Sequence, residues 1–380
     1  MTTTELDQLR RTARDFCDRE VRPGARERDR TEAFPEDLVR KMVEVGFLGA
    51  AIPEEYGGMG LDSHGYQVII EEMGAADSSI RSMLSVNMGL FGMSVLKWGT
   101  QQQKERWLPG ICEGRLGAFG LTEPGAGSNP SQLESRAVKV GDVWVINGSK
   151  VYITNGSLGA VTKIFARAFD GDAELGITCF LVPQDADGYQ GRQIHGKLGL
   201  RSGDTAEISM TDVHVGDDAV LGEVGGGMKV ALSALDNGRF SLSAGCVGTC
   251  REALEVATTY ALERTQFGRP IAGFQLVQEL LAAMHVDYSA AKALVDQLAV
   301  KKESGERFTL EAATAKLFCT EAAVRNADRA VQVHGGHGYI DEYPVQRMLR
   351  DARVTTLYEG TSQIQHLIIG RQLTGISAFT

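Results

Sequence analysis

The chain has 380 residues, which is enough for two or three domains that share a sizeable core. Hydrophobic residues make up 43% of it and charged residues 23%, as is typical of a folded globular protein. The formal net charge of −10 disfavours a general nucleic-acid binder, because such proteins depend on Lys and Arg meeting phosphates. No apolar run approaches the ~20 residues of a membrane span. We therefore expect neither a nucleic-acid partner nor a membrane partner.

The N-terminus and the cysteines bear on the cellular compartment. The first residues include Glu5 and Asp7 and lack the apolar segment of a signal peptide. The six cysteines form no CxxC pair and lie near no histidine cluster, so we expect no zinc site. Cys246 and Cys250 are one helical turn apart in an apolar segment and are expected to be buried free thiols. These features favour the cytoplasm.

The first third of the chain is predicted to be helical. Thr2 and Glu5 have the spacing of a capping box, and the apolar residues that follow recur every three or four positions. A second helical period ends at Gly46, which can cap a helix. A further helix is predicted from Gln101 to Leu108, where Pro109 should break it.

Short β-type runs replace the helical pattern from Phe119 onward. Asn147-Gly148 is a strong tight-turn signal, so a hairpin is expected there, and Gly141-Asp142 marks another turn. The sequence predicts a compact antiparallel domain from Phe119 to about Val224. Its expected strands lie at residues 134–140, 143–146, 150–153, 161–169, 176–182 and 206–215.

The last part of the chain returns to helical periodicity. Gly225-Gly226-Gly227 is expected to be a hinge rather than a phosphate loop, because no strand–glycine–helix order surrounds it. Apolar stripes over 277–298 and 310–333 predict a helical bundle. The order of helices, strands and helices lacks βαβ alternation and argues against a Rossmann fold. The fold class is therefore α+β and mostly α.

Four segments carry more glycine, hydroxyl and ionisable groups than a scaffold requires. Each has a structural explanation when it stands alone: a connecting loop, a strand end, a helix terminator or a helix cap. His334 and His337 are three residues apart, but no carboxylate or cysteine is placed beside them, so no metal site is expected. Glu359 could cap a helix, or it could be a base whose mobility Gly360 permits. The four segments are residues 119–128, 152–156, 332–338 and 358–365.

Together and in this order, these segments resemble the acyl-CoA dehydrogenase family over nearly the whole chain, from Pro53 to Arg371. The resemblance implies an N-terminal α-helical domain (1–118), a middle β-barrel domain (119–226) and a C-terminal four-helix bundle (227–380). It also implies FAD, a homo-oligomer that is usually a tetramer, and a role in fatty acid metabolism. The matching elements include Thr122-Glu-Pro-Gly-Ala-Gly-Ser128, Lys197-Leu-Gly-Leu-Arg201, Leu235-Asp-Asn-Gly-Arg239, Arg264-Thr-Gln-Phe-Gly268 and Tyr358-Glu-Gly-Thr361.

The family resemblance makes Glu359 the catalytic base. In this family a carboxylate removes the α-proton of an acyl thioester while the β-hydride leaves to flavin N5. Some relatives carry the base on an earlier helix, just before the position of Arg239, but this chain has Gly238 there, which cannot serve. Burial against the flavin and the acyl chain should raise the pKa of Glu359 toward the working pH.

The resemblance also assigns cofactor and substrate contacts. The flavin ring and pyrophosphate would be lined by Phe119, Leu121, Thr122, Gly127, Ser128, Tyr152, Ile153 and Thr154. The FAD of a neighbouring subunit would meet Arg264, Gln266, Phe267, Phe274, Gln275, Gln332, Gly335 and Gly336. The adenosine side would meet Thr361 and Gln363, and the acyl thioester would meet Ser128, Asp236, Arg239, Tyr358, Gly360 and Arg371.

The expected activity is dehydrogenation of an acyl-CoA, with electrons passed to an electron-transferring flavoprotein. One alternative is the same chemistry on a carrier-protein-bound acyl or aminoacyl thioester in a biosynthetic pathway. A second is a flavin oxidase that uses O2, although the chain lacks the extra C-terminal domain of the long acyl-CoA oxidases. A third is a flavin-retaining scaffold, against which the intact Glu359 argues.

The acyl group is not predicted by the sequence. The segment 82–88 suggests an apolar, adaptable wall, but methionine in such a run is more often plain core.

Overall fold

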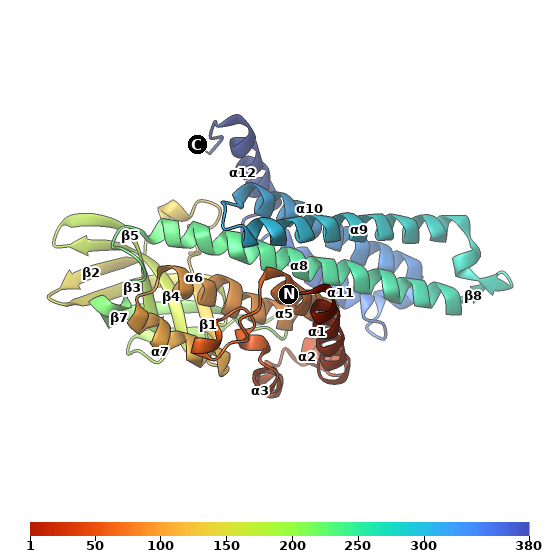
Figure 1. The fold of residues 1–380 in the computed structure, drawn as a ribbon, viewed down its shortest axis with the longest axis horizontal. Helices are drawn as coiled ribbons and strands as arrows, with labels where there is room; N and C mark the ends of the chain where they lie inside the picture. Colours follow the sequence, from red (N-terminus) through yellow and green to blue (C-terminus); the bar gives the residue numbers. More distant parts are fainter. Residues whose placement is uncertain (380) are drawn as a thin grey trace.

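The computed structural model describes residues 1–379, and its first third is helical (Figure 1). Helix α1 (Thr3–Phe16) begins with the predicted capping box, in which the Thr2 hydroxyl accepts from the Glu5 backbone N–H and the Glu5 carboxylate accepts from that of Thr2. The other helices of this part are α2 (Ala25–Thr31), α3 (Glu36–Glu44), α4 (Ser63–Ala76), α5 (Ser78–Ser85), α6 (Met93–Trp98) and α7 (Gln101–Cys112). Two π-helical segments, Cys17–Val21 and Val86–Gly92, extend α1 and α5.

Pro109 does not end its helix, contrary to the prediction. It lies inside α7, which continues to Cys112, and its carbonyl accepts a hydrogen bond from the Glu113 N–H at 3.0 Å. A proline removes one backbone donor from the helix. Near the C-terminal end that loss is tolerated, because Leu108 and Ile111 are buried on either side of Pro109 and packing stabilises the last turn.

The middle third forms a seven-stranded sheet that is mixed rather than antiparallel. β1 and β2 both pair with β4 in parallel, whereas β3 pairs with β7 and β4 with β5 in antiparallel orientation. Parallel pairs need long crossover connections, which local turn signals do not reveal. The strands are β1 (Gly117–Gly120), β2 (Arg136–Val140), β3 (Val143–Thr154), β4 (Val161–Asp170), β5 (Ala173–Pro183), β6 (Tyr189–Gln193) and β7 (Thr205–Gly216).

Asn147-Gly148 lies within β3, opposite a β-bulge in β7, and is not the predicted hairpin turn. β3 runs through it without interruption, and the register against β7 shifts between Ile146 and Gly148. Asn147 exchanges two hydrogen bonds with Asp212 of β7, at 3.0 and 2.9 Å. The extra residue of this bulge belongs to β7, where Asp212 has a φ of +50°, so the irregularity depends on a partner strand that the local Asn-Gly pattern does not reveal. The turn at Gly141-Asp142, between β2 and β3, is confirmed.

Long helices make up the last part of the chain. Figure 1 shows α8 running from the sheet at one end of the molecule to a small β-ribbon at the other end. The predicted apolar stripe lies on α9, where Met284, Ala291, Val295 and Leu298 are buried. The elements are α8 (Gly227–Glu263), β8 (Thr265–Gln266), β9 (Arg269–Pro270), α9 (Gln275–Glu303), α10 (Thr309–His334), α11 (Val345–Thr355) and α12 (Ser362–Thr374).

The glycines at 225–227 form a packing contact rather than a free hinge. The Gly225 N–H donates to the Thr178 hydroxyl of β5 at 2.8 Å. A Cβ on Gly227 would lie 2.8 Å from the Ile177 carbonyl oxygen, so only glycine allows α8 to begin this close to β5. This contact places the start of α8 against the sheet.

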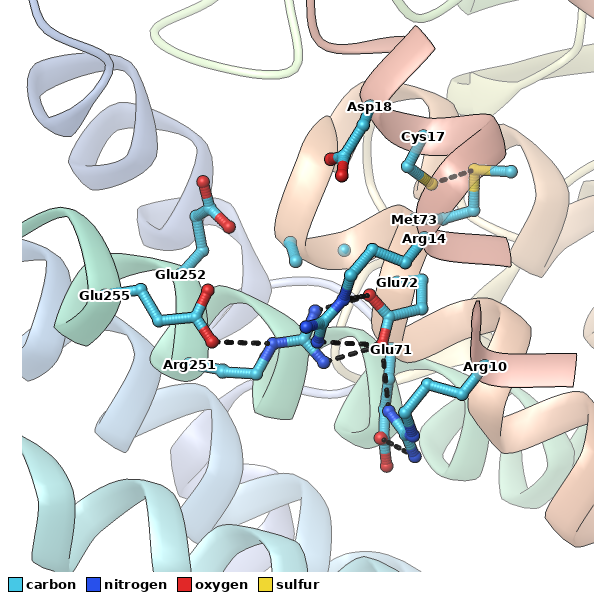
Figure 2. Close-up of polar contacts among 12 residues, drawn as sticks. Arg10, Arg14, Cys17, Asp18, Glu71, Glu72, Met73, Arg251, Glu252 and Glu255 are labelled. Carbon is cyan, nitrogen blue, oxygen red and sulfur yellow. Dashed lines mark hydrogen bonds and ion pairs between the residues drawn. The ribbon is translucent and has the colours of Figure 1, made fainter. Parts of the chain in front are cut away.

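A buried charge cluster joins α1, α4 and α8 (Figure 2). The Glu72 carboxylate of α4 is fully buried and accepts two hydrogen bonds from Arg251 of α8, each 2.6 Å long. Arg10 and Arg14 of α1 reach the same carboxylate at 2.9 and 3.2 Å. One carboxylate therefore fixes three helices relative to one another.

Two further findings concern the whole described chain. All six cysteines are buried free thiols, as expected for Cys246 and Cys250. Among residues 1–379, no helix combines the length and the apolar character that crossing a membrane requires.

Candidate active site

A cavity of about 790 Å³ lies where the sheet, α5, α8 and the loop before α12 meet. Its middle-domain wall consists of the residues predicted to line the flavin: Phe119, Leu121, Thr122, Gly127, Ser128, Tyr152, Ile153 and Thr154. Its opposite wall contains residues predicted to serve as the base or to contact the substrate: Asp236, Arg239, Tyr358, Glu359, Gly360 and Arg371. The fold thus gathers in one cavity groups that are far apart in the sequence.

Glu359 lies in the loop between α11 and α12 and is held there by its backbone. Its φ of +55° is unusual for a residue with a side chain, so the surrounding structure must hold the loop in place. The Glu359 carbonyl accepts from Nε of Arg239 and from Nε2 of Gln365, both at 3.2 Å. The next carbonyl, that of Gly360, accepts from Nζ of Lys316 at 2.8 Å. The Glu359 carboxylate remains free, and its Oε2 atom has no hydrogen-bond partner.

The surroundings of Glu359 tune its acidity. Burial raises the pKa of its carboxyl to about 7, while the positive charges of Arg239, Arg81 and Lys316 oppose that rise. Burial also lowers the pKa of the Lys316 ammonium to about 8. A carboxyl group with a pKa near 7 is partly ionised near neutral pH, so it can accept a proton and release it again, as a general base must.

Gly238 of α8 faces the Glu359 carboxylate. A Cβ at position 238 would overlap Oε2 of Glu359 and lie 2.6 Å from Cδ2 of Leu90. Glycine at position 238 cannot act as a base, as the sequence already showed. It also leaves the space that the Glu359 carboxylate occupies.

Arg239 and Asp236 form an ion pair in the wall of the cavity that faces the predicted flavin wall. Nη1 of Arg239 lies 2.9 Å from Oδ1 of Asp236, whose other oxygen accepts from the Thr309 hydroxyl at 2.7 Å. Arg371 is exposed and lines the same cavity from the last turn of α12.

The residues predicted to meet a neighbouring subunit's FAD do not line this cavity. Arg264, Gln266 and Phe267 lie at the β8–β9 ribbon, and the Phe267 side chain is 93% exposed. Phe274 and Gln275 lie at the start of α9. The remaining members, Gln332, Gly335 and Gly336, lie at the end of α10.

Two further predicted contacts also lie outside the cavity wall. Thr361 is the N-cap of α12 and accepts from the Ile364 N–H at 3.3 Å, so the capping role that the sequence left open for this segment belongs to Thr361. Gln363 is exposed on the first turn of the same helix.

His334 and His337 lie within an aromatic cluster. The His334 ring stacks on Tyr260 with 4.2 Å between centroids, and its Nδ1 lies 2.8 Å from the Ala330 carbonyl oxygen. Within residues 1–379, His, Cys, Asp and Glu side chains form no group of three arranged to hold a metal ion.

The sequence indicated segment 82–88 as a wall but did not show which residues of α5 and the π-helical segment face the cavity. The cavity is lined there by Arg81, Ser82, Ser85, Val86 and Leu90, so the wall is partly polar. The methionines of this stretch, Met83 and Met88, are core residues instead. Every residue from Ser78 to Gly92 is buried, so no spacing in this stretch separates the cavity face from the face that packs in the core.

Family models match the chain in three consecutive parts. They are described as the acyl-CoA dehydrogenase N-terminal domain (residues 3–115), middle domain (118–213) and C-terminal domain (225–374). The Bacillus subtilis protein named "Probable acyl-CoA dehydrogenase YngJ" is 41% identical over 98% of both chains. The short-chain specific acyl-CoA dehydrogenase of mouse mitochondria is 39% identical over 96% of this chain and 89% of the relative.

The chain belongs to the acyl-CoA dehydrogenase family. Members of this family are oxidoreductases that act on the CH–CH group of acyl-CoA.

Solved structures agree with this assignment. A glutaryl-CoA dehydrogenase from Mycobacterium smegmatis in complex with FADH2 superposes with a TM-score of 0.95 at 33% identity, covering 100% of this chain and 97% of that one. A chain from a structure of the electron transferring flavoprotein of Acidaminococcus fermentans has a TM-score of 0.95 at 37% identity, over 98% and 99%. The prolyl acyl carrier protein oxidase AnaB has a TM-score of 0.94 at 31% identity, over 98% and 100%.

This acyl-CoA dehydrogenase has a cavity that fits the family cofactor, FAD. The middle-domain wall offers the rings of Phe119 and Tyr152, and the Tyr152 side chain is 70% exposed instead of packed. The hydroxyl groups of Thr122, Ser128 and Thr154 line the same wall. An aromatic surface with hydroxyl donors beside it suits a flat heterocycle that carries polar edges.

Proposed function

We propose that Glu359 removes the α-proton of an acyl thioester bound in this cavity. The observation that carries the proposal is the Oε2 atom of Glu359, which is buried without a hydrogen-bond partner in a residue that lines the same cavity as the predicted flavin wall. Bound FAD supplies the hydride acceptor in this chemistry. The protein contributes placement of the base, its proton affinity and exclusion of water.

The loop geometry prepares Glu359 for this role. Three side chains, Arg239, Lys316 and Gln365, bind the carbonyls of Glu359 and Gly360, so the backbone is fixed while the carboxylate stays free. Apolar groups of Val86, Leu90 and Leu235 line the cavity and keep water from the carboxylate. A fixed and desolvated base loses little further freedom when the substrate arrives.

The CoA part of the substrate is proposed to contact Arg239, Asp236 and Arg371, and Ser128 to lie near the thioester arm. In support, all four line the cavity. A guanidinium can bind phosphate or amide oxygens with two parallel hydrogen bonds. A phosphopantetheine arm is common to CoA and carrier proteins, so these contacts serve either donor.

We further propose a homo-oligomer, usually a tetramer in this family, in which the exposed β8–β9 ribbon meets a neighbouring subunit's FAD. The 93% exposure of Phe267 supports this proposal, because a large apolar side chain in water favours burial in an interface. The buried free cysteines support a cytoplasmic enzyme.

Turnover of matched thioesters tests the proposed function. The FAD-loaded protein is mixed with CoA esters and with the same acyl groups on a carrier protein, and the enoyl products and H2O2 are measured. We expect oxidation of a CoA ester with electron-transferring flavoprotein as acceptor and little peroxide. Turnover of carrier-bound esters alone, as the similarity to AnaB would suggest, or peroxide equal to product would contradict the proposal.

A further inference from the structure

Lys163 of β4 is a buried cation beside the predicted flavin wall, and the proposed mechanism does not use it. Its side chain is fully buried. Its ammonium group donates to the Leu90 carbonyl oxygen and, at 2.6 Å, to the Ser94 hydroxyl. Within residues 1–379, the buried Lys150 of β3 has a carboxylate partner in Glu123 at 2.6 Å, whereas Lys163 has none. Lys163 therefore brings a positive charge into the interior without a negative charge to balance it.

The pairing of two strands places this ammonium group behind the cavity wall. Lys163 of β4 is opposite Phe119 of β1 in the parallel register. Its Nζ atom lies 4.9 Å from the centroid of the Phe119 ring, which is within the range of a cation–π interaction. Phe119 lines the cavity and Lys163 does not, so the ammonium group belongs to the layer of the protein behind that ring.

Packing does not explain a lysine at this position. A buried ammonium group without an acidic partner is unfavourable, and an apolar side chain of similar length would fill the same space without that cost. Burial lowers the pKa of the Lys163 ammonium to about 7, so the group is mostly charged at pH 6. The titratable group that faces it, the Cys179 thiol of β5, stays neutral because burial raises its pKa to about 12.

We propose that the positive charge of Lys163 raises the reduction potential of FAD bound in this cavity. The inference rests on the predicted flavin wall and is independent of the role proposed for Glu359. In the family reaction, a hydride leaves the acyl thioester and the α-proton goes to the base. A hydride carries two electrons and one proton, so it adds one negative charge to the ring system that accepts it. A fixed positive charge nearby favours that reduced form, most strongly where water is excluded.

The competing role for Lys163 is structural. Through Leu90 and Ser94 it ties β4 to the π-helical segment Val86–Gly92 and to α6. Loss of these hydrogen bonds would lower stability, whereas loss of the charge would lower the potential. The two roles can be separated, because substitutions at positions 163 and 94 remove the hydrogen bonds and the charge independently.

The potential is measured at pH 6 by anaerobic reduction of each FAD-loaded protein with dithionite, in equilibrium with a dye of known potential. Lys163→Gln keeps a donor for the Leu90 carbonyl but has no charge. We expect a tenfold shift of the equilibrium toward oxidised flavin, which corresponds to a potential about 30 mV lower for a two-electron couple. Lys163→Met should give the same shift together with a lower Tm.

Two substitutions of Ser94 leave Lys163 in place and form a matched pair. Ser94→Asp gives the ammonium group a carboxylate partner, so it should lower the potential as Lys163→Gln does. Ser94→Ala removes only the hydrogen bond and should keep the potential of the unmodified protein. This pair still decides between the two roles if the Lys163 variants do not retain FAD.

An unchanged potential in Lys163→Gln or in Ser94→Asp would overturn the proposal and assign Lys163 a structural role. A fall in Ser94→Ala as large as that in Ser94→Asp would also overturn it, because the lost hydrogen bond would then be the cause. No substrate is added in these measurements, so a failure of the proposed base is detected separately. It would appear as fast reduction of Glu359→Gln by a thioester, with the effect of Lys163 on the potential intact.

Discussion

At the scale of single residues, Gly238 and Glu359 depend on each other. A methyl group at position 238 would overlap Oε2 of Glu359 and press on Leu90, so the carboxylate must move. A displacement of about 1 Å in a reacting group can cost about 100-fold in rate. We expect Gly238→Ala to lower kcat/KM by about that factor while retaining FAD.

The control for that variant is Gly370→Ala. Gly370 lies in α12, and a Cβ there meets no atom within 4 Å, so its rate and its Tm should stay close to those of the unmodified enzyme. Unchanged kcat/KM in Gly238→Ala would show that the carboxylate does not need the position that the structure gives it.

The acidity of Glu359 predicts a pH profile. Because burial raises the pKa of this proposed base to about 7, its ionised fraction, and with it kcat/KM, should fall about tenfold per pH unit well below pH 7 and level off above it. Lys316→Met removes a charge that lowers this pKa, so the rise should move to higher pH. Lys316→Gln can still donate to the Gly360 carbonyl, so its kcat should be closer to that of the unmodified enzyme than the kcat of Lys316→Met is. The pH midpoint of its profile should nevertheless stay shifted, because glutamine carries no charge. A midpoint that is the same in all three proteins would contradict this electrostatic account.

At this scale, the site residues that could be predicted are those in short segments of unusual chemistry. Glu359, Arg239 and the glycine-rich loop around Gly127 were predicted only because their segments, taken together, resemble one family, and the structure places them in one cavity. Arg81 and Lys316 were missed because each is one charged residue within an ordinary helical pattern. Their importance comes from burial beside Glu359, which depends on how α5 and α10 pack.

At the scale of elements, the Glu72 cluster joins three helices (Figure 2). Burial alone would raise the pKa of Glu72, but hydrogen bonds and charges from Arg251 and Arg14 outweigh it, so the pKa is lowered. A carboxylate with a lowered pKa contributes stability above its unfolded value, near 4.5, and that contribution is lost as the pH falls. Glu72→Gln should reduce the free energy of unfolding by about 3 kcal/mol at pH 7.

Urea unfolding measures this loss, and Glu255→Gln is its matched control. Glu255 contacts Arg251 at 3.6 Å from the exposed side, so its replacement should cost less than about 1 kcal/mol. The difference between Glu72→Gln and the unmodified protein should shrink below pH 4. Equal stability of the two variants at pH 7 would mean that the cluster does not hold α1, α4 and α8 together.

Element boundaries show where local patterns stop being informative. The capping box at Thr2 and the stripe on α9 were predicted correctly, because both depend on residues within one helix. Pro109 was wrongly predicted to end its helix, because burial of the last turn of α7 keeps that turn helical. Asn147-Gly148 was wrongly predicted to be a hairpin turn, because pairing with β7 keeps both residues within β3. The parallel pairing of β1 and β2 with β4 is likewise non-local.

At the scale of the whole molecule, three parts of the chain meet around the cavity in which we propose that catalysis takes place. The sheet supplies the predicted flavin wall, the first part supplies Arg81 and its neighbours, and the last part supplies Glu359. The long helix α8 contacts both the sheet and the loop that carries Glu359, since Gly227 packs on β5 and Gly238 faces Glu359. Loss of the proposed base should therefore leave cofactor binding intact, because the predicted flavin wall belongs to a different part of the chain.

Anaerobic flavin reduction in the Glu359→Gln variant tests this claim most directly. Both proteins are loaded with FAD, mixed with a thioester that the unmodified enzyme oxidises, and followed by flavin absorbance in stopped flow. We predict equal FAD content and a reduction rate about 1,000-fold lower in the variant, because the α-proton has no acceptor. Reduction of the variant at the rate of the unmodified enzyme would show that another group is the base.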